Sequence, residues 1–238
     1  MHPSIIAVVL AAGKGTRMKS AVAKVLHQVF FRPMIHHVLD AVHHTGIAQC
    51  AVIVGHQRQE VEQALATFTV TTVLQEQQLG TGHAVLCAEA ACEGHEEVLI
   101  LCGDTPLIRA ETLREMIEAH HREQAALTLM TTQVLEPFGY GRILHDQQGR
   151  IQAIVEEKDA TPQQRQIKEI NAGIYLVNRS FLFAALRQVG TNNAQGEVYL
   201  TDIVALANGQ GQRVHTFLHP QAIDVLGVNS RVELAQAQ

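Results

Sequence analysis

The sequence predicts an α/β fold: a Rossmann-like, mostly parallel sheet flanked by helices. The main observation is that short apolar runs, typical of buried strands, alternate with segments of helical periodicity over the first 134 residues. A second is that polar or glycine-rich loops follow these runs, as at Gly13, Gln75 and Asp104. Because ligands of such sheets bind beyond the carboxyl ends of the strands, the three loops are expected to converge on one cleft.

The elements of this alternating part can be placed in order. Strands are expected over residues 5–9, 51–54, 69–74, 98–102 and 127–134. Helices are expected from Pro33, at the first helical position, to a stop at Gly46, around Val61 and Leu65, from Thr81 through Ala91, and over residues 111–123.

The pattern changes at Pro137. The string Gly-Tyr-Gly-Arg-Ile at 139–143 and the turn at 147–149 predict a hairpin laid over the sheet. Residues 169–175 predict a return to a strand, and a polar loop at 192–197 precedes a helix opened by residues 199–202. The chain closes with a last helix after Ser230.

The loop after the first strand, Leu-Ala-Ala-Gly-Lys-Gly-Thr-Arg-Met at 10–18, carries the strongest functional signal. Its two glycines allow a tight turn whose backbone N–H groups can converge on an anion. Residues 1–39 carry five cations and no acid, so this segment is +5 in a chain of net charge −5. A local cationic loop on an acidic protein favours a small polyanionic ligand over nucleic acid, which usually needs a broad basic face.

Three other interpretations of this loop differ in how well its residues fit them. A P-loop requires glycine where the chain has Val8. The dinucleotide fingerprint requires glycine where the chain has Met18, and an acid ending a second strand where Asp40 falls within a predicted helix. An ordinary strand-to-helix turn with solvated lysines stays open for a lone glycine pair.

Composition restricts the class of protein and its compartment. No apolar run approaches the roughly 20 residues of a membrane span, and no signal peptide is recognisable. The four cysteines form no CxxC pair, so free, buried thiols in a reducing cytoplasm are expected rather than a zinc site. Three adjacent histidine pairs lie on predicted helices, where neighbours point about 100° apart, so surface or capping roles are expected.

The loop at 10–18 resembles the signature of the sugar-1-phosphate nucleotidylyltransferases. Further strings extend the resemblance, from about Ile6 to Arg231, to the uridylyltransferase domain of the bacterial bifunctional N-acetylglucosamine-1-phosphate uridylyltransferase/glucosamine-1-phosphate acetyltransferases. These strings are Gln-Leu-Gly-Thr-Gly-His-Ala at 78–84, Gly-Tyr-Gly-Arg-Ile at 139–143, Glu-Ile-Asn-Ala-Gly-Ile at 169–174, Asn-Asn-Ala-Gln-Gly-Glu at 192–197 and Gly-Val-Asn at 227–229.

The resemblance implies a reaction and a division of the chain. A sugar 1-phosphate oxygen attacks the α-phosphorus of UTP, so that N-acetylglucosamine 1-phosphate becomes UDP-N-acetylglucosamine and pyrophosphate leaves. Residues 1–229 would form the nucleotidylyltransferase domain, with a nucleotide-binding part at about 1–136 and a smaller, β-rich sugar-binding lobe at about 137–229. Residues 230–238 would start a C-terminal helix, and the acetyltransferase β-helix domain would be absent.

The resemblance also implies roles for individual residues. Arg17 and Lys24 would be catalytic, because they neutralise the triphosphate and the attacking phosphate. Asp104 and Asn229 would hold Mg²⁺, which binds oxygen ligands and keeps several waters. Substrate would be bound by Lys24 and Asn229 together with Leu10, Ala11, Ala12, Gly13, Gln75, Gly80, Thr81, Gly103, Gly141, Glu156 and Asn171.

Within this set Gln75 would pair with uracil, while Gly141, Glu156 and Asn171 would contact the sugar. Glu157 could take the role of Glu156. Glu197 and Tyr199 are weaker candidates for the N-acetyl side of the pocket.

Two residues depart from the family's pattern, with Ala23 where proline is usual and Cys102 where tyrosine is usual. Both bear on catalytic efficiency more than on reaction type. The alternatives are the same fold acting on another sugar 1-phosphate or nucleotide, and a non-catalytic UDP-sugar-binding module; retention of Arg17, Lys24 and Asp104 argues against the second. No nucleic-acid or membrane partner, no acetyl transfer and a mainly monomeric chain are expected.

Overall fold

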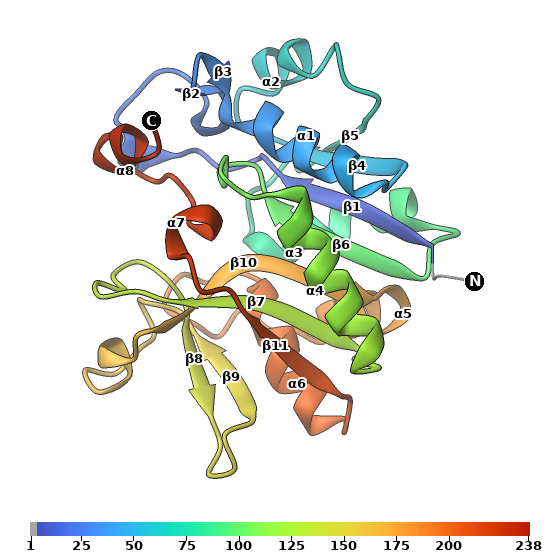
Figure 1. The fold of residues 1–238 in the computed structure, drawn as a ribbon, viewed down its shortest axis with the longest axis vertical. Helices are drawn as coiled ribbons and strands as arrows, with labels where there is room; N and C mark the ends of the chain where they lie inside the picture. The colour runs from blue at the N-terminus through green and yellow to red at the C-terminus, as the bar shows by residue number, and fades with distance from the viewer. Residues whose placement is uncertain (1–3) are drawn as a thin grey trace.

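A computed structural model describes residues 4–238 and confirms the α/β fold with a mostly parallel sheet (Figure 1). The main path of the central sheet runs β11-β7-β10-β6-β1-β4-β5, and β8 and β9 branch from β10. Its strands are β1 (Ile5–Leu10), β4 (Gln49–Val54), β5 (Thr71–Leu74), β6 (Glu97–Cys102), β7 (Leu127–Gln133), β8 (Arg142–His145), β9 (Ile151–Val155), β10 (Glu169–Asn178) and β11 (Val214–Leu218). A small separate hairpin pairs β2 (Gln28–Val29) with β3 (Arg32–Pro33).

Strand direction follows the connections between the strands. β5, β4, β1 and β6 are parallel neighbours, as the intervening helices require, and β11 is parallel to β7. β10 runs antiparallel to both β6 and β7, so it separates the two parallel groups. The carboxyl ends of β1 and β6 therefore lie side by side, with Leu10 paired to Cys102.

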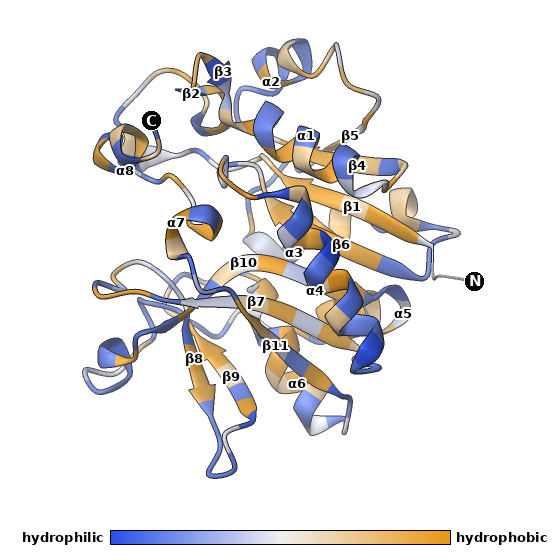
Figure 2. Ribbon diagram, viewed as in Figure 1, coloured by the Kyte–Doolittle hydropathy of each residue, from blue (hydrophilic) through white to orange (hydrophobic). Residues whose placement is uncertain are grey.

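Helices cover both faces of the sheet because successive residues of its buried strands point to opposite sides. On one face Ala7 and Val9 of β1 share a core with α1 (Met34–Thr45) and α4 (Ala110–Arg122). On the other, Ile6 and Val8 share a core with α3 (Thr81–Cys87), α5 (Arg179–Leu186) and α6 (Ile203–Gly209). Figure 2 shows the central strands as the most hydrophobic part of the ribbon. Each fully buried Val, Leu or Ile contributes roughly 1.5–3 kcal/mol to this packing.

The remaining helices are short. They are α2 (Arg58–Ala64), α7 (Ala222–Val225) and α8 (Arg231–Gln236), with 3₁₀ turns at Thr16–Met18, Lys24–Leu26, Ala90–Cys92, Gln164–Gln166 and Leu200–Asp202. Among residues 4–238, no helix is both long and apolar enough to cross a membrane.

Several local predictions need correction. Pro33 ends β3 and precedes α1 instead of occupying its first position. The helix expected through Ala91 ends at Cys87, and a separate 3₁₀ turn follows. The hairpin β8–β9 does not lie over the sheet: Arg142 pairs with Ile170 of β10, so the hairpin extends the sheet as a branch.

The expectation of surface or capping roles is wrong for His120. Its side chain is 2% exposed and lies between Thr128, whose Oγ1 is 2.8 Å from Nδ1, and Glu97, whose Oε1 is 3.5 Å from Nε2. The Nε2 atom of His121 lies 2.8 Å from the other oxygen of Glu97. The two histidines therefore flank a largely buried carboxylate at the start of β6.

Candidate active site

A cleft of about 500 Å³ opens beyond the carboxyl ends of β1 and β6. Most of the predicted site residues line it, although they come from distant parts of the chain. They are Leu10, Ala11, Ala12, Gly13, Arg17, Lys24, Gln75, Gly80, Thr81, Asp104 and Asn229. The weaker candidate Glu197 also lines the cleft, and the remaining lining residues, beyond those predicted, are Lys14, Gly15, Thr16, Val25, Gln78, Ala84 and Cys102.

The glycine loop forms one wall of this cleft. The Ala11 N–H donates to the carbonyl of Ile53 at 2.9 Å, which fixes where the loop leaves the sheet. A Cβ on Gly13 would meet nothing within 4 Å, so the backbone there is open to a ligand. Gly15 has φ +58, and a Cβ at this position would lie 2.6 Å from Cβ of Lys24. Glycine is therefore required where the loop packs against the lysine.

Two cations and two oxygen-bearing side chains meet at one point of the cleft. Arg17 Nη2 and Lys24 Nζ donate to Asn229 Oδ1 at 2.8 and 2.7 Å. Lys24 also forms an ion pair with Asp104, and both side chains are largely buried. The Val228 N–H donates to the carbonyl of Asp104 at 2.8 Å, which ties the C-terminal segment to the end of β6.

The geometry of this network fits a divalent cation. Because the oxygens of Asp104 and Asn229 both contact the same Lys24 ammonium, they converge on a position where a positive charge is stabilised. Within residues 4–238 there is no group of three or more His, Cys, Asp or Glu side chains arranged for a metal. Two oxygens completed by water and phosphate match Mg²⁺ better than a metal that prefers a full protein cage.

Gln75 lines the cleft and is only 3% exposed. Its Nε2 donates to the Gly80 carbonyl at 3.1 Å and lies 3.0 Å from His83 Nδ1. Both donor positions of the amide are thus used within the protein, which leaves its carbonyl oxygen for a ligand. Gly80 has φ +110, and a Cβ there would lie 2.5 Å from the Val198 carbonyl.

The three residues predicted for the sugar form a separate group outside the lining of this cleft. The Asn171 N–H donates to the Gly141 carbonyl at 2.9 Å, and a Cβ on Gly141 would lie 3.6 Å from each oxygen of Glu156. Thr201, absent from the predicted set, donates to Glu156 Oε1 at 3.0 Å. Burial raises the pKa of Glu156, against the hydrogen bond from Thr201.

A β-bulge shapes this group. The register of β10 against β7 shifts between Asn171 and Tyr175, and Gly173 within the bulge has φ +76. The side chain of Asn171 accepts from the Gly173 N–H at 3.0 Å and donates to the Tyr175 hydroxyl at 2.6 Å. A Cβ on Gly173 would lie 3.0 Å from the sulfur of Cys102, so the bulge reaches the cleft.

The other candidates occupy distinct places. Glu157 is ion-paired with Arg142 at 2.5 Å, so it does not share the environment of Glu156. The Tyr199 hydroxyl donates to Asp159 at 3.1 Å, whereas Glu197 lines the cleft beside Gly80 and Thr81. Gly103 does not line the cleft; its N–H donates to the Leu10 carbonyl at 2.9 Å and joins the ends of the two strands.

The two departures from the family pattern have simple local descriptions. Ala23 is buried with φ −53, a value that proline also adopts. Cys102 lines the cleft, and burial together with the nearby Asp104 raises the pKa of its thiol to about 12. All four cysteines are free thiols.

The fold and the cleft define a class of enzyme. Residues 7–170 match the family described as "MobA-like NTP transferase domain". The chain belongs to this family, and it is a nucleotidyltransferase domain.

More specific similarity comes from whole sequences. A relative named "Bifunctional protein GlmU" from Desulfotalea psychrophila is 57% identical over 231 residues, which cover 97% of this chain and 68% of the relative. A relative of the same name from Geobacter metallireducens is 52% identical over 237 residues, which cover 98% of this chain and 49% of the relative. The chain thus spans about half the length of the Geobacter relative.

Solved structures support the fold. A UDP-glucose pyrophosphorylase complexed with UDP-glucose has a TM-score of 0.77 at 20% identity, covering 98% of this chain and 96% of that chain. A protein from Bacillus anthracis described as a glucose-1-phosphate thymidylyltransferase has a TM-score of 0.80 at 21% identity, covering 98% of this chain and 93% of that chain. At these identities the likeness extends to the fold alone.

Proposed function

We propose that this chain is a uridylyltransferase that makes UDP-N-acetylglucosamine and pyrophosphate from UTP and N-acetylglucosamine 1-phosphate. The observation that carries the proposal is the meeting of Arg17 and Lys24 with Asp104 and Asn229 at one point of the cleft. The 57% identity to a relative named "Bifunctional protein GlmU" supports the choice of substrates within the nucleotidyltransferase class.

The main barrier of the reaction is electrostatic, because an anionic sugar phosphate must approach an anionic triphosphate. Alignment and charge neutralisation lower this barrier without a covalent nucleophile. Arg17 offers a planar fork of donors and Lys24 a compact charge, and both already point to the same oxygen of Asn229. We propose that phosphate oxygens replace that contact when substrates bind, while the open backbone at Gly13 contacts the triphosphate.

We propose Asp104 and Asn229 as the holders of Mg²⁺. When bound there, the ion would supply charge stabilisation to phosphate oxygens. Asp104 would contribute a negative charge and Asn229 a neutral oxygen, and the Lys24 ammonium contacts both side chains.

The binding pockets are proposed from the same contacts. The free carbonyl oxygen of Gln75 would accept from the imide N–H of uracil. Glu156 is the better candidate for a sugar hydroxyl, because Glu157 is already engaged by Arg142. Four free cysteines support a cytoplasmic location, where thiols stay reduced.

A pyrophosphate-release assay across four nucleoside triphosphates and a panel of sugar 1-phosphates tests the proposal. We expect the highest kcat/KM for UTP with N-acetylglucosamine 1-phosphate, and a product with the mass of UDP-N-acetylglucosamine. A higher value for another pair would replace the substrates in this proposal. Absence of turnover with every pair, at saturating Mg²⁺, would favour a UDP-sugar-binding module.

A further inference from the structure

The loop at residues 135–141 lies between the two halves of the candidate active site. On one side, a Cβ on Gly139 would lie 3.2 Å from Arg17 Nη1. On the other, Gly141 contacts Asn171 through its carbonyl and faces Glu156. The position of this loop therefore determines how Arg17, the proposed phosphate-binding residue, is placed relative to the proposed sugar pocket.

Apolar packing holds only part of the loop. Pro137 is buried and Tyr140 is half-buried, but Leu135 is 88% exposed and Phe138 is 79% exposed. Gly139 has φ +84, a left-handed conformation that glycine adopts but does not prefer over others. Polar contacts therefore add order where burial is incomplete.

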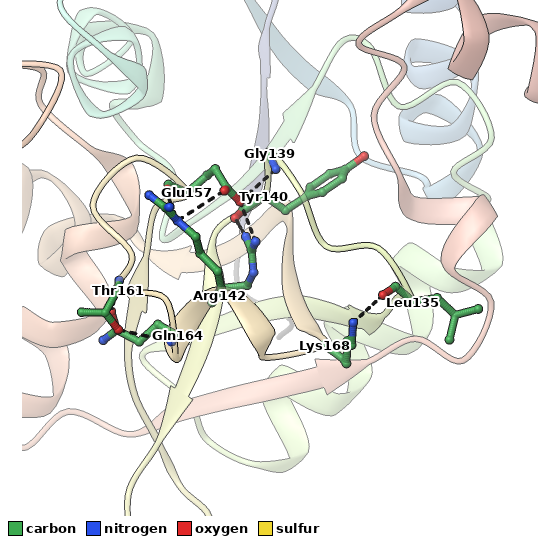
Figure 3. Close-up of polar contacts among 9 residues, drawn as sticks. Leu135, Gly139, Tyr140, Arg142, Glu157, Thr161, Gln164 and Lys168 are labelled. Carbon is green, nitrogen blue, oxygen red and sulfur yellow. Dashed lines mark hydrogen bonds and ion pairs between the residues drawn. The ribbon is translucent and has the colours of Figure 1, made fainter.

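Figure 3 shows where those contacts come from. Arg142 is 1% exposed; its Nη1 donates to the carbonyl of Tyr140, and its Nη2 is 2.5 Å from Glu157 Oε2. The same oxygen of Glu157 accepts the Gly139 N–H at 3.1 Å. The pair thus binds two successive residues of the loop, one through a carbonyl and one through an N–H. At the other end, Lys168 Nζ donates to the carbonyl of Leu135 at 2.5 Å.

We propose that Arg142 and Glu157 are positioning residues that fix Gly139 and Tyr140 and thereby align Arg17 with the sugar-binding residues. The inference rests on the proposed nucleotidyl transfer, and neither residue lines the cleft. Burial acts to raise the pKa of Glu157, but the hydrogen bonds from Arg142 and the Gly139 N–H outweigh it, so the pKa is lowered and the carboxylate is ionised at neutral pH. A second contact of the loop, from the Tyr140 hydroxyl to the Gly227 carbonyl at 3.4 Å, extends the alignment towards Asn229.

The test compares Glu157→Ala with Glu157→Gln and with a matched control, Gln164→Ala. Gln164 accepts the Thr161 N–H at 2.9 Å in a neighbouring turn and lies outside the loop and the proposed site (Figure 3). Glu157→Ala should lower kcat by roughly ten- to a hundredfold, since small misalignments of reacting groups cost this much. Glu157→Gln retains an acceptor for the Gly139 N–H and should recover most of the loss, whereas Gln164→Ala should retain parental kcat.

Hydrogen–deuterium exchange of the ligand-free proteins gives a readout that does not depend on the substrate. Exchange in a peptide spanning residues 135–141 should become faster in Glu157→Ala and stay unchanged in Gln164→Ala. Turnover is measured with whichever substrate pair the parent uses best, so a wrong substrate refutes the proposed function and leaves the comparison valid. The inference is overturned if Glu157→Ala matches Gln164→Ala in kcat, or if exchange over 135–141 does not change.

Discussion

Replacement of Asp104 by asparagine is the most direct test of the proposed metal site. The change keeps the size of the side chain and leaves the backbone contact from Val228 to the Asp104 carbonyl intact. It removes the negative charge that faces Lys24 and that would hold Mg²⁺ against the phosphates. If this charge contributes about 4 kcal/mol to the transition state, kcat falls about a thousandfold.

The effect on folding should be moderate. An acidic chain would be expected to gain stability when a carboxylate is removed, but Asp104 is paired with Lys24, so its loss also breaks a favourable contact. Because both side chains are largely buried, the Lys24 ammonium loses its charged partner and keeps only Asn229, and we expect a cost of about 2–3 kcal/mol. For a domain of this size that corresponds to a fall in Tm of roughly 4–12 °C.

Steady-state kinetics over a range of Mg²⁺ concentrations provide the assay, with Gln75→Ala as the comparison. Gln75 lies in the same cleft but contacts Gly80 and His83 instead of the cations. Its replacement should raise KM for UTP and leave the dependence on Mg²⁺ unchanged. If Asp104→Asn retained more than about a tenth of parental kcat at saturating Mg²⁺, the proposed metal role would have to be abandoned.

Three further outcomes follow from single side chains. Ala23→Pro should raise stability by about 0.4–1 kcal/mol, because φ is already −53 and the unfolded chain loses freedom; thermal unfolding checks this, and a lower Tm would contradict it. Burial raises the pKa of Glu156, so its ionisation opposes folding as pH rises above about 4. Glu156→Gln should therefore be more stable than the parent at pH 7 but less active, with a difference in stability that shrinks towards pH 4. Burial acts to raise the pKa of Glu97, but its two neighbouring histidines lower that pKa below the value in the unfolded chain. The ionised Glu97 should therefore stabilise the fold at pH values above its unfolded pKa, and this stabilisation should be lost as the pH falls through its pKa in the folded protein. Urea unfolding of Glu97→Gln and the parent over this acidic range should show their difference disappear, and a difference independent of pH would refute the assignment.

The strands that form the centre of the sheet could be predicted because their sequences are almost entirely apolar. The run at Glu97–Cys102, for example, is buried on both faces, and its apolar pattern fits few structures other than a central strand. The edge strand β11 could not be recognised in this way, because its residues are only partly buried and include His215 and Thr216. The helix α5 carried a usable signal, since the Asn178 side chain caps it by accepting the Phe181 N–H.

The glycine loop and the residues at strand ends were also accessible from sequence, since the topology of a parallel sheet brings such ends together. The family resemblance then supplied Asn229, which lies 125 positions beyond Asp104. Contacts that depend on how separate segments of the chain pack together could not be predicted from the sequence. Two examples are the hydrogen bond from Thr201 to Glu156 and the ion pair of Arg142 with Glu157. No local sequence pattern indicates that these residues lie close together.

A competition experiment tests the proposed choice of sugar directly. Equal concentrations of N-acetylglucosamine 1-phosphate and glucose 1-phosphate are supplied together with limiting UTP, and the ratio of the two UDP-sugars is measured by mass spectrometry at low conversion. This ratio equals the ratio of the two kcat/KM values. We predict that UDP-N-acetylglucosamine predominates by at least about tenfold, the discrimination expected from one set of pocket contacts. An excess of UDP-glucose would contradict the proposed function.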